Sequence, residues 1–223
     1  MREYYSKKLS ANKLKRCYDI ASPRIKQYLK AEINFVLKHI HSSDTVLELG
    51  CGYGRVLREL AKHASKVVGI DTSFESLELA KEYLLDYRNI ELHQMNANSL
   101  NFKEETFDTV IAIQNGISAF KVEPEVLLRE SLRITKKNGK LILSSYSENF
   151  WEERLKWFIL QSEDELLGEI DYEKTGNGFI VCKDGFIATT FSKNDFQNLL
   201  QKMNLKGSIQ EIDLSSIFCI IRK

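Results

Sequence analysis

The sequence predicts an α/β fold in which a mostly parallel sheet lies between two layers of helices. Two observations lead to this prediction: short apolar runs alternate with amphipathic helices from residue 45 to residue 144, and a glycine-rich turn follows the first run. Alternation at this spacing is typical of parallel sheets with helices on both faces. A chain of 223 residues is long enough for one such domain with a full core.

The first 41 residues predict two helical pieces that are separated near Pro23. Ser22 suits the N-cap of the second piece, and Pro23 suits its first turn. Apolar residues then recur at helical spacing and give this piece one apolar face. That face consists of Ile25, Leu29, Ile33, Val36, Leu37 and Ile40. We expect residues 1–41 to form a helical lid.

Residues 42–145 carry the alternation of strands and helices and predict the central core. The expected strands span residues 45–49, 67–70, 90–94, 109–113 and 141–144. The expected helices span residues 55–62, 74–85 and 125–135. The dipeptide Asn138-Gly139 is a stop signal for the last of these helices.

The alternation stops after residue 145. Residues 146–191 predict a helix at 148–167 and a hairpin with strands at 178–182 and 186–191. We interpret this segment as a cap inserted over the carboxyl ends of the strands, where open α/β sheets bind ligands. Residues 192–223 predict a helix at 194–203 and two strands, at 206–212 and 216–221, that pair antiparallel at one edge of the sheet.

Composition and charge disfavour several classes of protein. The formal charge of +1 argues against a surface built to hold nucleic acid. No stretch of ~18 apolar residues is present, so we expect no membrane span, and the N-terminus lacks the apolar core of a secretory signal. Four cysteines are scattered without the spacing of metal ligands. This pattern suits a reducing cytoplasm, without a disulfide framework or a zinc site.

The glycine-rich turn is the most informative segment. Gly50, Gly52 and Gly54 follow a buried strand and open a helix, where glycines allow close approach of the backbone to a nucleotide-like ligand. Asp71 ends the next strand, where a carboxylate can accept hydrogen bonds from both ribose hydroxyls. The alternative is a tight loop, with Asp71 as an ordinary helix cap. Arg55 stands where a dinucleotide-binding fold would have a glycine, which disfavours an NAD-dependent oxidoreductase.

The segment from Val46 to Gly54, together with Asp71, resembles the class I S-adenosylmethionine-dependent methyltransferases, particularly the ubiquinone-biosynthesis-like (methyltransferase type 11) group. The resemblance covers residues 46–145. It implies a Rossmann-like three-layer sandwich with a seven-stranded, mostly parallel sheet that has an antiparallel edge strand. It also implies S-adenosyl-L-methionine as the cofactor and S-adenosyl-L-homocysteine as the product.

By this resemblance, residues 48–54 wrap the methionine part of the cofactor and Asp71 holds the ribose. The residues expected at the cofactor are Glu48, Gly50, Cys51, Gly52, Gly54, Asp71, Thr72, Asn96, Ala97, Asn98, Gln114, Asn115, Gly116 and Tyr28. Asn96 departs from the family, which usually has an acid there to bind the adenine amino group. An asparagine oxygen can still accept from that group without a charge, so we expect weaker cofactor binding. Asn98 or Ser99 is the alternative adenine contact.

The parts that the common fold does not require are expected to face the substrate. Their aromatic side chains could line an apolar pocket or surround a cation, or they could simply dock their helices on the body. The candidates are Tyr18, Arg24, Tyr146, Trp151 and Tyr172. No residue is assigned as catalytic, and no metal site is expected.

The sequence therefore predicts transfer of a methyl group to a small-molecule acceptor by in-line displacement. In such a reaction the protein mainly positions the reactants and excludes water. A general base could assist an acceptor that carries a proton. The alternatives are a methyltransferase that acts on a protein and a non-catalytic cofactor-binding protein. We expect a monomer or a homodimer, with neither nucleic acid nor membrane as a partner.

Overall fold

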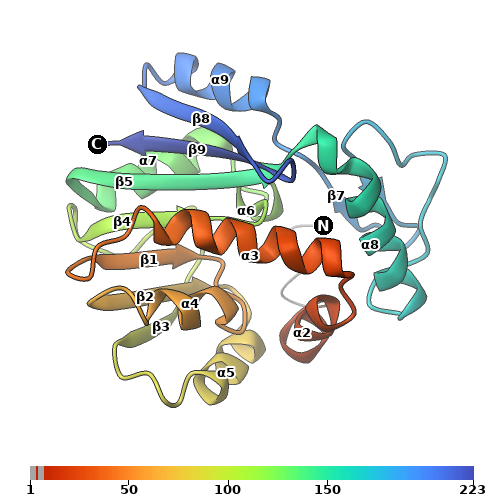
Figure 1. Cartoon of the computed structure of the whole chain (residues 1–223), viewed down its shortest axis with the longest axis horizontal. Coiled ribbons are helices and arrows are strands. Elements are labelled where there is room, and N and C mark those ends of the chain that lie inside the picture. The colour runs from red at the N-terminus through yellow and green to blue at the C-terminus, as the bar shows by residue number, and fades with distance from the viewer. Residues whose placement is uncertain (1–3, 5–7) are drawn as a thin grey trace.

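A seven-stranded sheet forms the centre of the structure (Figure 1). The structure is a computed structural model that describes residue 4 and residues 8–223, so residues 1–3 and 5–7 of the predicted lid lie outside the described residues. The strand order is β3-β2-β1-β4-β5-β9-β8. The strands are β1 (Thr45–Leu49), β2 (Lys66–Asp71), β3 (Ile90–Gln94), β4 (Phe107–Ala112), β5 (Thr135–Tyr146), β8 (Gly207–Ile212) and β9 (Ser216–Arg222).

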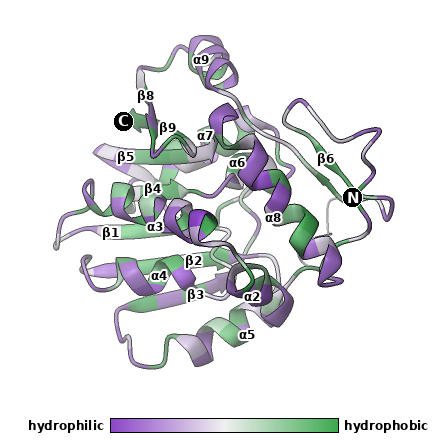
Figure 2. Cartoon of the chain, turned by 45° about the vertical axis from the view of Figure 1, so that its right-hand side comes forward, coloured by the Kyte–Doolittle hydropathy of each residue, from purple (hydrophilic) through white to green (hydrophobic). Residues whose placement is uncertain are grey.

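Strands β1 to β5 pair in parallel, whereas β9 runs antiparallel to both β5 and β8. The predicted mostly parallel sheet with an antiparallel pair at one edge is therefore confirmed. Parallel strands are stable when helices cover both of their faces. The strands carry mostly hydrophobic residues, as this burial requires (Figure 2).

Helices cover both faces of the sheet, and successive residues of a strand face opposite layers. The helices of the main body are α3 (Pro23–Leu37), α4 (Arg55–Leu60), α5 (Phe74–Tyr83), α6 (Gly116–Ala119), α7 (Pro124–Ile134) and α9 (Lys193–Lys202). Val46 and Val67 share a hydrophobic cluster with residues of α3, α4 and α5. The next residue of each strand, Leu47 or Val68, belongs to a cluster with α6, α7 and α9. This arrangement is the two-residue repeat of strands that are buried on both faces.

Helix α3 begins where the sequence predicted. The Ser22 hydroxyl accepts a hydrogen bond from Ile25 N at 3.2 Å, and Pro23 occupies the first turn. With 15 residues, α3 is the longest helix in the described part of the chain. Over those residues, no helix combines the length and the apolar character needed to span a membrane.

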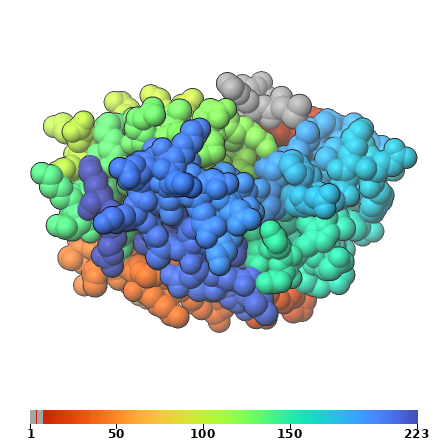
Figure 3. All heavy atoms as spheres, turned by 90° about the horizontal axis from the view of Figure 1, so that it is seen from above, coloured from red at the N-terminus to blue at the C-terminus, as the bar shows by residue number. Residues whose placement is uncertain are grey.

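A third hydrophobic cluster joins the beginning of the chain to the segment after β5. The elements around it are α2 (Ala11–Asp19), η1 (Glu148–Phe150), α8 (Trp151–Glu163), β6 (Ile180–Val181) and β7 (Ile187–Ala188). The cluster contains Cys17 from α2, Tyr28 from α3 and Trp157 from α8. Trp157 Nε1 also donates a hydrogen bond to Cys17 O at 2.9 Å. These elements lie together at one end of the sheet (Figures 1 and 2), and the segment after β5 forms that end in the space-filling view (Figure 3).

The observed elements differ from the predicted ones mainly at their ends. Strand β5 begins at Thr135, directly after α7, instead of at residue 141. Asn138 has a φ of 64°, and the pairing register with β4 shifts between Phe107 and Thr109. The predicted turn at Asn138-Gly139 is thus an irregularity inside a strand. Sequence patterns do not distinguish a turn between two elements from an irregularity inside a strand, because both use a residue with positive φ.

The hairpin of the cap is shorter than predicted. Only Ile180–Val181 pairs with Ile187–Ala188. The residues that follow β7 turn to the main sheet instead: Thr189 O accepts a hydrogen bond from Asn115 Nδ2 at 2.8 Å, and Phe191 N donates to Ser145 Oγ at 2.9 Å. These bonds attach the cap to the loop after β4 and to the end of β5.

Candidate active site

A cavity of about 230 Å³ lies where the carboxyl ends of the parallel strands meet α2 and α8. Its wall brings together many of the residues predicted at the cofactor. Those that line it are Glu48, Gly50, Gly52, Asp71, Thr72, Asn96, Ala97, Gln114, Asn115 and Gly116. Tyr18 and Tyr146, predicted at the substrate, line the same cavity. This position, outside the carboxyl ends of the strands, is where open α/β sheets bind ligands.

The glycine loop after β1 forms one side of the cavity. Gly50, Gly52 and Gly54 have φ values of 72°, 53° and 88°, which other residues adopt only at a cost. Gly50 N donates to Ile70 O at 2.8 Å, so the loop is attached to the end of β2. A Cβ atom at Gly52 would lie 2.9 Å from Leu14 Cδ2. The loop therefore needs glycine both for its backbone angles and for the close approach of α2.

Asp71 connects the glycine loop to the second strand. Its Oδ2 accepts a hydrogen bond from Gly52 N at 2.8 Å, and its Oδ1 accepts from Ser73 N at 2.8 Å. Burial raises the pKa of Asp71, and these backbone N–H groups oppose the rise. The N-cap of α5 is Ser73, whose hydroxyl accepts from Ser76 N. Asp71 is thus not the helix cap, and its carboxylate faces the cavity.

Glu48 is buried beside the same loop. Burial raises its pKa to about 8; Arg55 opposes the rise by its positive charge, and Asp71 adds to it by its negative charge. Glu48 Oε2 has no hydrogen-bond partner in the described structure. A buried polar atom without a partner is costly, so an unpartnered atom at a cavity indicates a place for a ligand group.

The turn after β4 forms the opposite side of the cavity. Gln114 and Asn115 have φ values of 55° and 65°, which are unusual for residues other than glycine. Gln114 N donates to Glu32 Oε2 at 2.8 Å and to Ser144 Oγ at 2.9 Å. Asn115 Oδ1 accepts from Ser145 Oγ at 2.8 Å. Gln114 Nε2 is buried and has no partner in the described structure.

Asn96 lines the cavity where the resemblance places the adenine ring. Its Oδ1 accepts a hydrogen bond from Asn98 N at 3.0 Å, so the oxygen that was expected to accept from adenine already holds a backbone group. Asn98 itself is not on the cavity wall. A carbonyl oxygen has a second lone pair, which leaves one acceptor position on Asn96.

Helices α2 and α8 close the remaining side. Trp157, Phe158 and Gln161 of α8 line the cavity together with Leu14 and Cys17 of α2. The substrate candidates expected from this part of the sequence, Trp151 and Tyr172, are not on the wall, whereas Trp157 and Phe158 are. The available signal was spacing, because residues 157, 158 and 161 share one face of a helix.

Four residues predicted at the cofactor lie outside the cavity wall. The Cys51 side chain packs against Gly69 in the layer with α4, and a Cβ at Gly54 would meet Leu84 Cδ1 at 2.5 Å. Asn98 is exposed. Tyr28 is fully buried behind the wall, with its ring centre 5.5 Å from that of Tyr146.

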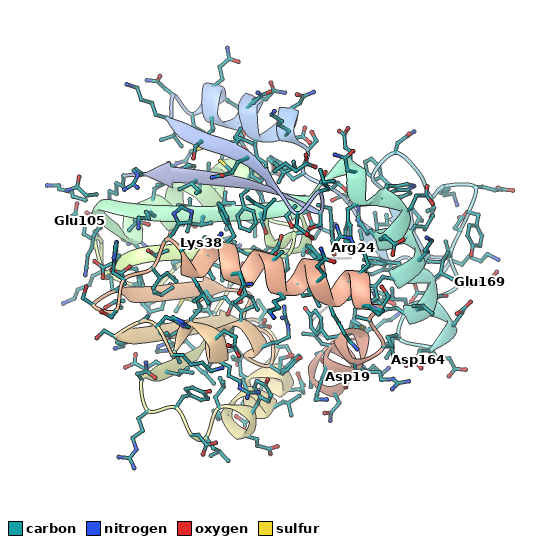
Figure 4. The ribbon with its side chains drawn as sticks, in the orientation of Figure 1. Asp19, Arg24, Lys38, Glu105, Asp164 and Glu169 are labelled. Carbon is teal, nitrogen blue, oxygen red and sulfur yellow. The ribbon has the colours of Figure 1, made fainter. Side chains whose placement is uncertain are left out.

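Three residues predicted at the substrate also lie outside the wall. Arg24 is labelled in Figure 4 at the start of α3; its Nη1 forms an ion pair with Asp213 Oδ2 at 2.7 Å. Tyr172 is 64% exposed on the outer side of the cap. The Trp151 ring lies 5.9 Å from the guanidinium of Arg154, within the cap. Across the described residues, no group of three or more His, Cys, Asp or Glu side chains is placed to hold a metal ion.

Comparison with known proteins identifies the central part of the chain. A family model for a methyltransferase domain matches residues 46–139, which include the glycine loop, Asp71 and Gln114. Residues 46–139 are therefore similar to the class I S-adenosylmethionine-dependent methyltransferases. The cofactor of this class is S-adenosylmethionine.

The names of the curated relatives describe methyltransferases that act on different molecules. The chain is 38% identical over 104 residues to phosphatidylethanolamine N-methyltransferase of Cereibacter sphaeroides, covering 45% of this chain and 50% of that one. It is 28% identical over 141 residues to ubiquinone biosynthesis O-methyltransferase of Coxiella burnetii, covering 63% and 56%. The alignments therefore span about half the length of these curated relatives.

A solved SAM-dependent methyltransferase from Aquifex aeolicus has the same fold. The two structures superimpose with a TM-score of 0.63 at 19% identity, over 93% of this chain and 97% of the other. At this identity the likeness concerns the fold alone.

Proposed function

We propose that this chain transfers a methyl group from S-adenosylmethionine to an uncharged small molecule. The observation that carries the proposal is that the glycine loop, Asp71 and the aromatic face of α8 line one cavity. In this proposal residues 42–145 bind the cofactor, and residues 192–223 complete the sheet. The lid that ends at residue 41 and the cap at residues 146–191 enclose the acceptor.

The polar atoms of the wall suit the methionine end of the cofactor. Glu48 Oε2 and Gln114 Nε2 are buried without a partner in the described structure, and both residues line the cavity. One is an acceptor and the other a donor, which matches the amino and carboxylate groups of methionine. We assign the ribose to Asp71, since each of its oxygens holds one backbone N–H and keeps a further lone pair.

The wall on the side of α2 and α8 suits an uncharged acceptor. Its aromatic side chains are Tyr18, Tyr146, Trp157 and Phe158. Glu48 and Asp71 are the charged residues of the described wall, and both lie beside the glycine loop. An anionic acceptor would therefore meet no cation on the wall itself. Arg154, whose guanidinium lies 4.4 Å from the centre of the Tyr146 ring, is a positive charge outside the wall that opposes the negative charge of Glu48 and Asp71, so the cavity favours neither a cation nor an anion as the acceptor.

The cofactor, when bound, supplies a methyl group on a sulfonium leaving group. The residues of the chain then hold the acceptor in line and exclude water, and such positioning accounts for a large part of the rate. Leu14, Cys17 and Trp157 cover the cavity, and the Trp157–Cys17 hydrogen bond joins the two covering helices. Burial raises the pKa of Tyr146 to about 12, so its protonated hydroxyl can orient an acceptor but does not serve as a base at neutral pH.

The first test is calorimetric titration with S-adenosylmethionine, S-adenosylhomocysteine and NAD in parallel. We expect binding of both adenosyl compounds and none of NAD. The Asp71→Ala variant should lose affinity, while Asp86→Ala, which removes an exposed acid between α5 and β3 that does not line the cavity, should bind as the wild type does. Binding of NAD, or no binding of either adenosyl compound, would contradict the proposed function. Binding without turnover of any uncharged hydroxyl, amine or thiol compound would favour a non-catalytic cofactor-binding protein.

A further inference from the structure

Glu32 is a fully buried acid that none of the roles above uses. It lies on α3, and its side chain is 0% exposed. Its Oε2 accepts the hydrogen bond from Gln114 N at 2.8 Å, whereas Oε1 has no partner in the described structure. No Lys, Arg or His among the described residues lies within ion-pair distance of it. A buried carboxylate without an ion pair is unfavourable for folding, so its presence calls for another reason.

The contact with Gln114 supplies that reason. Gln114 and Asn115 form a left-handed turn in which neither residue is glycine, and such a backbone persists only where its surroundings hold it. Glu32 and Ser144 hold it from outside the turn, through one N–H group. The side chains of the turn line the cavity, and Asn115 also bonds to Thr189 O of the cap.

We propose that Glu32 is a positioning residue whose ionised carboxylate holds Gln114 and Asn115 in the conformation that binds the cofactor and faces the acceptor. This proposal rests on the proposed function. A hydrogen bond to an ionised acceptor is roughly twice as strong as one to a neutral acceptor. Removing the charge should therefore loosen the turn without removing the side chain.

The surroundings of Glu32 place its titration near neutral pH. Burial raises its pKa to about 7, opposed by the neighbouring hydroxyl groups of Ser216 and Ser144, by the hydrogen bond from Gln114 N and by the positive charge of Arg55 on α4. Tyr28 on the same helix and Tyr146 on β5 also face this group, and both remain protonated because burial raises their pKa values. The carboxylate is thus ionised above pH 7 and protonated below it, and the turn should be held more firmly at the higher pH.

The first experiment observes Gln114 directly and needs no cofactor. In the wild type, the amide proton of Gln114 should shift with pH around a midpoint near 7, because its acceptor changes charge. In Glu32→Gln the same signal should stay constant from pH 6 to pH 8.5. A wild-type signal that does not move, or a Glu32→Gln signal that titrates as in the wild type, would overturn the proposal.

The second experiment measures S-adenosylhomocysteine affinity at pH 6 and pH 8.5. Relative to the wild type, Glu32→Gln should bind equally well at pH 6 and about 5-fold more weakly at pH 8.5, the scale that separates a charged from a neutral hydrogen bond. Glu48, whose pKa burial raises to about 8, also titrates at the cavity, but its effect is common to both proteins and cancels in the ratio.

Two variants control for simple damage. Ser144→Ala removes the neutral acceptor of the same N–H and should keep a pH-dependent affinity, with its midpoint moved to higher pH because the Ser144 hydroxyl lowers the pKa of Glu32. Glu125→Gln removes a carboxylate that pairs with Lys202 of α9 and does not line the cavity, and it should match the wild type throughout. If the affinity of Glu32→Gln relative to the wild type is the same at both pH values, the proposed role of Glu32 is wrong, and the proposed function is not affected. Failure of the wild type to bind the cofactor product would instead overturn the proposed function, and the amide titration would still decide the role of Glu32.

Discussion

Replacing Glu32 with glutamine should stabilise the protein at alkaline pH while it weakens cofactor binding. The pKa of this carboxyl rises from its ordinary value of 4.5 to about 7 on folding, chiefly because of burial. At about 1.4 kcal/mol per pH unit, the ionised form costs the folded state about 3 kcal/mol at pH 8. Glutamine has nearly the same shape and removes that cost. A residue kept only for structure would not show opposite effects on stability and on binding.

The sign of the effect follows from proton binding. Between pH 4.5 and about 7 the folded state holds more protons on Glu32 than the unfolded state does, so the stability of the wild type falls as pH rises through this window. The loss of stability caused by ionised Glu32 reaches its full value above pH 7, whereas at pH 5 it is less than about 1 kcal/mol. For a chain of this size, 1 kcal/mol corresponds to about 2–4 °C in Tm.

Thermal unfolding measured at pH 5 and pH 8 tests this reasoning. The Tm of Glu32→Gln minus that of the wild type should be about 4–8 °C larger at pH 8 than at pH 5. Part of the gain is offset at both pH values by burial of the amide N–H₂, which leaves the difference between them intact. The Glu125→Gln control should show little difference between the two. If the Tm difference between Glu32→Gln and the wild type is the same at both pH values, or if the variant loses more in Tm at pH 8, then Glu32 is not an ionised group that destabilises the folded state.

The cavity wall supports three further predictions. Asp71→Ala should reduce S-adenosylhomocysteine affinity by at least about 1.5 kcal/mol in calorimetry, the scale of a lost charge-assisted hydrogen bond, and unchanged affinity would remove the ribose assignment. Gly52→Val should abolish binding and leave the circular dichroism spectrum intact, because a β-branched side chain is strained at a φ of 53° and its Cβ would displace Leu14 from the cavity wall; normal binding would mean that the loop does not hold the cofactor. Since burial raises the pKa of Glu48 to about 8, cofactor binding at pH 7 should release a proton from it. Calorimetry in buffers of different ionisation enthalpy should detect that proton, and Glu48→Gln should not release it.

The sheet and the glycine loop could be predicted because local sequence determines them. Successive residues of β1, such as Val46 and Leu47, face different helical layers, and the apolar runs record that double burial. The positive φ of Gly52 is a property of the loop itself and does not depend on contacts with distant parts of the chain. The start of β5 was missed because a residue such as Asn138 serves equally well in a turn and in a bulge.

The site residues contributed by α2, α3 and α8 were harder to predict. Glu32 meets Gln114 across 82 positions of sequence, and Trp157 meets Cys17 across 140. Helical spacing shows which residues share a face, but the partner of that face depends on how the helix docks. Tyr28, expected at the cofactor, lies one layer behind the wall for the same reason.

The segment that matches the methyltransferase family covers only one part of the cavity. Residues 46–139 contain Asp71, Asn96 and Gln114, which face the cofactor side. Tyr18 and Trp157, which we assign to the acceptor side, lie outside that segment, and so does Glu32, whose carboxylate accepts a hydrogen bond from Gln114 N. The similarity to methyltransferase domains therefore bears on the cofactor side of the cavity and not on the acceptor side. Experiments on the acceptor should accordingly begin with substitutions on α2 and α8, whose packing against each other shapes that side of the cavity.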